Sequence, residues 1–114
     1  MTIKLKSFVN DAASKTNGLK LKIKLDAALY KKENISVDFE GINKYAFPFF
    51  NHSFVLLATP YGFQEIEQIE FLNISEDGMV IYKESMENAK FISELDEKQK
   101  RDVERIVNSI FDEK

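Results

Sequence analysis

Residues 34–58 read NISVDFEGINKYAFPFFNHSFVLLA, and this stretch decides the fold of the 114-residue chain. Apolar and polar side chains alternate from residue 35 to residue 39, which predicts a half-buried β-strand. Gly41 is expected to end the strand, because glycine adopts backbone angles that other residues avoid. Pro48 suits the first turn of an α-helix, since its φ is fixed and it has no N–H. The stretch therefore predicts a strand, a loop and then a helix.

The helix predicted from Pro48 to Ala58 should be well buried. Apolar side chains recur on one of its faces at helical spacing: Phe50, Phe54, Leu57 and Ala58. Phe49 and Leu56 widen this face. The segment TPYG at residues 59–62 is expected to end the helix.

Length and composition indicate one domain with its own core. The chain has no cysteine, which excludes disulfides, thiolate zinc sites and cysteine nucleophiles. Its first residues lack the apolar run of a signal peptide, and no segment approaches the roughly 20 apolar residues of a membrane helix. We therefore expect a cytoplasmic protein that does not enter a membrane.

Charge is distributed unevenly along the chain. Residues 1–32 carry eight lysines and two acidic residues, whereas residues 33–114 carry eight basic and seventeen acidic residues. A basic N-terminal third is compatible with nucleic-acid binding. However, it contains no arginine, the residue that favours two-pronged contacts to phosphates and bases. We interpret the lysines as solvated surface and do not expect a nucleic-acid partner.

Two segments fit either a helix or a strand. Residues 18–33 alternate leucine or isoleucine with lysine as a strand would, but one helix face would carry Leu21, Leu25, Ala28 and Leu29. We favour a helix there, capped by Thr16 or Asn17. Residues 75–78 could turn a hairpin into a strand at 79–82, or could open a helix with Ser75 as its cap. We favour the helix, because it would have an apolar stripe of Met79, Tyr82, Met86, Ala89 and Ile92.

The remaining elements complete an α/β order. Residues 1–9 predict a first strand at a sheet edge, and residues 64–73 predict a third strand. Asp96 is expected to cap a last helix with an apolar stripe of Val103, Ile106, Val107, Ile110 and Phe111. The order β-α-β-α-β-α-α predicts a small open mixed sheet, largely parallel in its later strands, with helices covering it. Residues 1–114 would form one domain, with 95–114 as an added C-terminal helix.

The sequence offers few residues for chemistry. His52, the only histidine, has neither a second ligand four residues later nor an acidic residue four residues earlier. Ser53 adjoins it, but adjacent residues on a helix do not face each other. Asp38 and Glu40 could hold a cation or act as acid and base, although we favour a solvated strand end. We expect no catalytic residue, metal site or cofactor, and no enzymatic activity.

An aromatic run surrounds the predicted start of the central helix. Tyr45 and Phe47 come at the carboxyl end of the predicted central strand, where open α/β sheets tend to bind their partners. Exposed rings there would mark a protein interface, whereas buried rings would belong to the core. The sequence leaves both interpretations open.

Several short motifs resemble the STAS-like domain family of bacterial proteins (DUF4325). They are VDFEGI at residues 37–42, the aromatic loop and helix that follow, and IEFLN at residues 69–73. Six positions match the pattern of the family: Gly18, Asp38, Phe39, Gly41, Phe49 and Phe54. The resemblance extends from about Lys4 to Ala89 and supports both helix interpretations above.

This resemblance implies a regulatory role. Regulatory STAS domains bind partner proteins, including kinase-like ATPases, through the loop and helix after the central strand. In classical members a serine or threonine at the start of that helix is phosphorylated to break the complex. Residues 41–51 contain neither amino acid, so we expect no such switch here.

We therefore expect a non-enzymatic regulatory module that binds a protein, such as a kinase-like ATPase. Its expected partner-binding residues are Asp38, Glu40, Tyr45, Phe47, Asn51 and His52. The alternative is a free-standing inhibitor or antitoxin-like protein that sequesters a target, with the predicted helix from Asp96 to Phe111 as its interface. A small enzyme or nucleotide binder is a third, less favoured interpretation.

Overall fold

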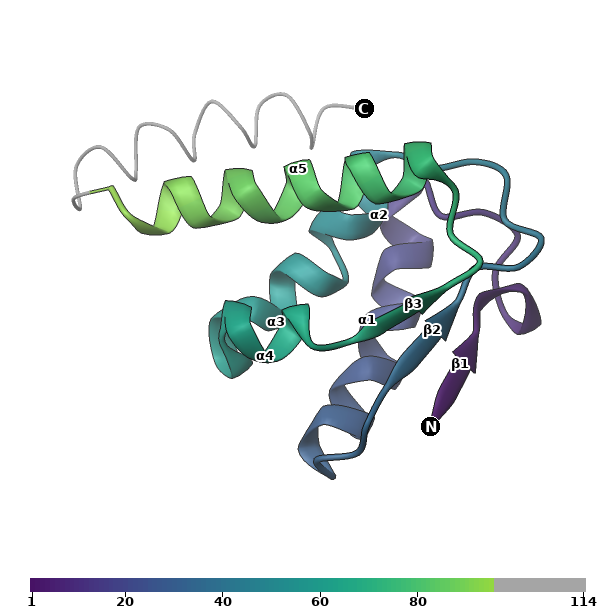
Figure 1. The fold of residues 1–114 in the computed structure, drawn as a ribbon, viewed down its shortest axis with the longest axis horizontal. Helices are drawn as coiled ribbons and strands as arrows, with labels where there is room; N and C mark the ends of the chain where they lie inside the picture. The colour runs from purple at the N-terminus through teal and green to yellow at the C-terminus, as the bar shows by residue number, and fades with distance from the viewer. Residues whose placement is uncertain (96–114) are drawn as a thin grey trace.

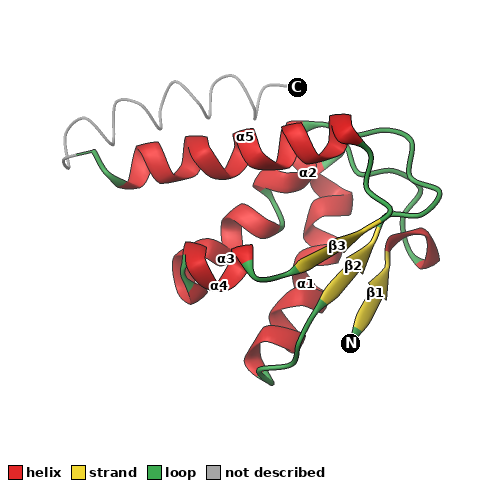
Figure 2. Cartoon of the chain, in the orientation of Figure 1, coloured by secondary structure: helices red, strands yellow, loops and turns green. Residues whose placement is uncertain are grey.

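Three short parallel strands form the sheet of the computed structural model, which describes residues 1–95 (Figures 1 and 2). The central strand is β2 (Ser36–Asp38), and it pairs with β1 (Thr2–Lys4) on one side and β3 (Glu70–Leu72) on the other. The strand predicted at residues 35–39 is therefore the interior strand. The open α/β sheet is confirmed, and all of its described pairs are parallel.

Helices connect the strands in the expected order. Figures 1 and 2 show them gathered on one side of the sheet, with α5 running past the end of β3. On the other face, Thr2, Lys4 and Glu70 are exposed to solvent. The helices are α1 (Lys15–Tyr30), α2 (Phe47–Asn51), α3 (Phe54–Tyr61), α4 (Phe63–Glu67) and α5 (Glu76–Ser93).

Aromatic rings fill the space between the sheet and α5. Phe71 from β3 packs edge-on against Tyr82 from α5, with ring centroids 4.6 Å apart. Phe39, which follows β2, lies 5.5 Å from Phe71 and 6.4 Å from Phe50 of α2. Each such pair contributes about 0.5–1.5 kcal/mol beyond the burial of its surface. The rings therefore join the sheet, α2 and α5 into one core.

The helix predicted from Pro48 to Ala58 is two helices, α2 and α3, which meet at a turn. The hydroxyl of Ser53 donates to the carbonyl oxygen of Phe49 (2.8 Å), while the Ser53 N–H donates to Phe50 only three residues back. A serine side chain that takes a carbonyl competes with the regular helical ladder. The prediction of one helix was wrong. The break arises from this local hydrogen bond, which does not change the spacing of the apolar residues from which the helix was predicted.

Two further expectations about this region were wrong. Leu56 was predicted to widen the buried face but is 42% exposed. The helix also ends later within the segment 59–62 than expected. Pro60 lies inside α3, and Gly62, with φ +93°, follows the last residue of this helix. The four side chains of the predicted face are all buried: Phe50, Phe54, Leu57 and Ala58.

The first and third strands are also shorter than the sequence pattern suggests. Residues 64–67, predicted as part of the third strand, belong to α4, and the first strand ends at Lys4, after which a 3₁₀ turn (Leu5–Ser7) begins. The two helices favoured over strands are confirmed as α1 and α5. Ser75 caps α5 as expected, but Ser14 caps α1 in place of Thr16 or Asn17. The predicted helix after Asp96 lies outside the described residues.

Gly18 sets how closely α1 approaches α2. A Cβ atom on Gly18 would lie 2.4 Å from the carbonyl oxygen of Phe49, which is main chain and cannot rotate away. The contact joins the first turns of α1 to the helix that follows the central strand.

We predict that Gly18→Ala lowers the free energy of unfolding by about 1–3 kcal/mol, the typical cost of forcing an extra methyl group into a packed site. At an exposed helix position the same change would stabilise the helix by up to about 1 kcal/mol. Urea unfolding followed by circular dichroism measures the difference. Lys20→Ala, on the exposed side of α1, is the matched control and should change stability little. Equal or greater stability of Gly18→Ala would contradict the proposed contact.

Candidate partner-binding site

The six predicted partner-binding residues lie along the chain that leaves the central strand. Asp38 and Glu40 come at the end of β2, Tyr45 lies in the following loop, and Phe47 begins α2. Asn51 and His52 stand where α2 ends. In Figure 1 this loop and the connection from β3 to α5 lie at the same end of the sheet.

Asp38 is a structural acceptor. It is only 8% exposed, and its Oδ1 accepts hydrogen bonds from the Glu40 N–H (2.9 Å) and from Nδ2 of Asn73 (2.9 Å). The bond from Asn73 and then that from the Glu40 N–H hold the pKa of Asp38 below its ordinary value, burial opposes them, and the charge of Lys4 adds a smaller lowering effect. The carboxylate thus ties the end of β2 to the end of β3.

A small hollow adjoins this carboxylate at the carboxyl ends of β1 and β2. Its volume is about 390 Å³. Gly41, with φ +83°, turns the chain so that Glu40 stays exposed at the rim. The lining residues are Lys4, Lys6, Ser7, Asp38, Glu40 and Gly41.

Tyr45 links the loop to the start of α5. Its hydroxyl donates to the carbonyl oxygen of Ile42 (3.2 Å) and accepts from the N–H of Ser75 (3.4 Å). The ring occupies the space above Gly78, where a Cβ atom would lie 2.5 Å from Cε2 of Tyr45. Tyr45 is half-buried and stabilises the fold. Its removal would therefore disturb the contact between the loop and α5 as well as the surface.

The start and end of α2 leave side chains partly exposed. Phe47 and Pro48 are half-buried, whereas the next residue, Phe49, is fully enclosed. Nδ1 of His52 lies 2.8 Å from the carbonyl oxygen of Pro48, and because a carbonyl oxygen only accepts, this nitrogen carries the proton. In the neutral ring Nε2 is then the acceptor. Asn51 is also half-buried.

Sequence patterns missed Asn73 and the role of Ser75 in this arrangement. Asn73 has φ +59°, a left-handed conformation that asparagine tolerates better than most residues, and this turns its amide toward Asp38. The sequence signal that could have identified this role was an asparagine between the third strand and the capped helix that follows it.

The described part of the chain has neither a candidate metal cluster nor a helix that could span a membrane. Residues 1–95 contain no group of three or more histidine, aspartate or glutamate side chains placed to hold a metal ion. Among those same residues, no helix combines the length and apolar character needed to cross a membrane.

A protein-family model matches the chain. The model of a STAS-like domain of unknown function (DUF4325) matches residues 17–79. This range covers more than half of the chain, from the first turn of α1 to the first turn of α5, and it includes β2, α2 and β3. The comparisons with curated proteins and with solved structures found no match.

We predict that Asp38→Asn lowers the melting temperature at pH 7, because a neutral amide accepts these hydrogen bonds more weakly than a carboxylate. The folded-state pKa of Asp38 lies below its ordinary 3.8, so the folded state binds this proton less readily than the unfolded state. The stabilisation is therefore complete above about pH 5 and is lost as the pH falls through the folded-state pKa.

Thermal unfolding of both proteins across pH 3–7 tests this linkage. The difference in melting temperature should be constant near neutrality and should shrink in acid. Asn73→Ala removes the largest cause of the depressed pKa and should reproduce part of the effect. A difference of the same size at pH 3 and pH 7 would show that the charge of Asp38 does not matter.

Proposed function

Because the chain belongs to the STAS-like domain family of unknown function (DUF4325), we propose that it is a non-enzymatic regulatory module that binds a protein partner in the cytoplasm. We propose a kinase-like ATPase as the partner, since regulatory STAS domains, which this family resembles, engage such proteins. The observation that carries the proposal is the half-buried ring of Phe47 at the start of α2, directly after the loop that leaves the central strand.

The contact surface would consist of Glu40, Phe47, Asn51 and His52. Their side chains are exposed or half-buried, and they border the loop and α2. An aromatic anchor with polar neighbours is the usual composition of an interface centre. Asp38 and Tyr45 would act indirectly. Their hydrogen bonds hold the loop in place and so position the contact residues.

Regulation would differ from that of classical STAS domains. Residues 41–51 contain no serine or threonine. The nearest hydroxyl on this loop, that of Tyr45, is bonded to Ile42 and Ser75. We therefore propose that binding at this surface is constitutive and is not released by a serine/threonine kinase.

We predict that Phe47→Ala weakens binding to the kinase-like ATPase encoded nearest to this gene by about thirtyfold, which corresponds to the roughly 2 kcal/mol of an aromatic hot spot. Isothermal titration calorimetry with the purified proteins gives the Kd. Tyr30→Ala is the matched control, because Tyr30 is an 82% exposed aromatic residue on α1 and far outside the proposed surface. Melting temperatures of both variants exclude loss of binding through unfolding.

Two results would count against this function. Unchanged affinity of Phe47→Ala would remove the proposed surface. Unchanged affinity combined with loss of binding in a chain that ends at Leu95 would favour the alternative, an inhibitor or antitoxin-like protein that sequesters its target through the segment from Asp96 to Phe111.

A further inference from the structure

β3 is an edge strand with main-chain groups that no described residue satisfies. The Glu70 N–H donates to Ile35 (3.0 Å), and the Leu72 carbonyl accepts from the Phe39 N–H (2.8 Å), so residues 70 and 72 bond toward β2. Main-chain groups of alternate residues point to opposite sides of a strand, so the N–H and C=O of Phe71 point away from β2. Within residues 1–95 neither group has a hydrogen-bond partner.

This edge is protected by its short length of three residues and by the charge of Glu70, but not by lysine or proline. Natural proteins cover edge strands, or place lysine, proline or a bulge on them, because unpaired N–H and C=O groups attract another strand. β3 has no lysine or proline, and its middle residue is a half-buried phenylalanine. The outer side of β3 can therefore accept one more strand.

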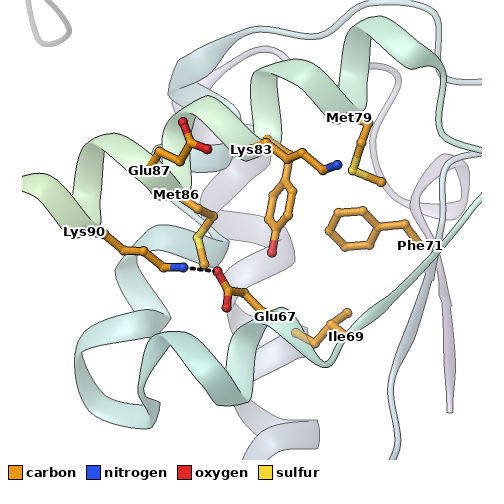
Figure 3. A pocket seen from close by; sticks show the side chains of 9 residues that line it. Glu67, Ile69, Phe71, Met79, Lys83, Met86, Glu87 and Lys90 are labelled. Carbon is orange, nitrogen blue, oxygen red and sulfur yellow. Dashed lines mark ion pairs between the residues drawn. The ribbon is translucent and has the colours of Figure 1, made fainter.

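A groove of about 450 Å³ lies between β3 and α5. Figure 3 shows Ile69 and Phe71 on one side of it, with Met79 and Met86 reaching in from α5. Methionine is flexible and polarisable, and adapts to side chains of different shape. The groove therefore has an apolar lining next to the unpaired edge.

The charges around the groove differ between its two ends. At one end, the ammonium of Lys90 pairs with the carboxylate of Glu67 and lies over the ring of Phe63. Toward the other end, Figure 3 shows the ammonium of Lys83 extending toward Met79, while the carboxylate of Glu87 points away from the groove. Lys83 forms no ion pair within residues 1–95. Lys83 is therefore a positive charge available at this end of the groove, while Glu67 and Glu87 balance the two lysines of the lining overall.

We propose that this groove binds an extended peptide segment of a partner protein, which adds to β3 as a fourth strand. The peptide main chain would exchange hydrogen bonds with the N–H and C=O of Phe71, as in other cases where a peptide extends a sheet. One apolar side chain would enter between Phe71 and Met79. An acidic group of the peptide would meet the ammonium of Lys83.

A single peptide strand fits this edge better than a second copy of the chain. A peptide strand needs less room beside β3 than a second copy does, because each copy carries α5 next to its own β3. A peptide needs only the width of one strand, about 4.8 Å from β3. This surface is separate from the one proposed at α2, so either proposal can fail without the other.

Selection from a phage-displayed library of random hexapeptides tests the inference. The full chain is the bait. Each selected peptide is resynthesised and titrated by fluorescence polarisation. Lys83→Glu should weaken binding about fivefold, as expected for one exposed ion pair, whereas Lys20→Glu on α1 should leave it unchanged.

Two measurements report on the main-chain bonds themselves. In hydrogen exchange followed by NMR, the amide of Phe71 should exchange at least about tenfold more slowly when peptide is bound, because a paired amide is protected. N-methylation along the peptide should reduce affinity at least about tenfold at the one position whose N–H bonds to Phe71, since a buried carbonyl then loses its partner. Side chains are unchanged in this scan.

Three outcomes would overturn the proposal. The library could yield no peptide that discriminates against Lys83→Glu. Bound peptides could leave the exchange of the Phe71 amide unchanged, which would place them at another surface. The Phe71 amide could instead become protected as the concentration of the chain alone is raised, together with a dimeric mass in solution, which would assign the edge to a second copy.

Discussion

The packing of Phe50 among other rings holds this small domain together. Its ring lies 6.4 Å from Phe39, 6.0 Å from Phe54 and 5.9 Å from Tyr82, measured between centroids. These partners come from the end of the central strand, from α3 and from α5. A sheet of three-residue strands has little surface of its own with which to hold helices. The aromatic contacts therefore fix where α2 begins, and so where the partly exposed residues of the candidate site stand.

Much of the fold follows from regular patterns in the sequence, and the exceptions have local causes. The alternation at residues 35–39 identified the central strand, and Ser75 with its following stripe identified α5. The break at Ser53 could not be read from apolar spacing, because it arises from a hydroxyl that takes a helical carbonyl. A five-residue helix such as α4 spans little more than one turn, too few residues to distinguish its period from that of a strand.

The sequence predicted residues of the candidate site, but not the hydrogen bonds that hold them in place. The pattern located Glu40, Phe47, Asn51 and His52 near the carboxyl end of the central strand, and they are exposed or half-buried there. The supporting roles of Asp38 and Tyr45 depend on partners 35 and 30 residues away in the chain. No local pattern contains such a pairing, since it depends on how the strands are placed side by side.

The register of the sheet has a consequence for synthesis on the ribosome. Ser36 pairs with Thr2 on one side and with Glu70 on the other, and each partner is 34 residues distant. Contacts this far apart form late, because a long loop must close before they contribute. Until β3 and α5 have left the exit tunnel, the rings of Phe50 and Phe54 lack their partners Phe71 and Tyr82. A growing chain with an unprotected phenylalanine-rich middle is a substrate for chaperones, which bind such segments before they aggregate.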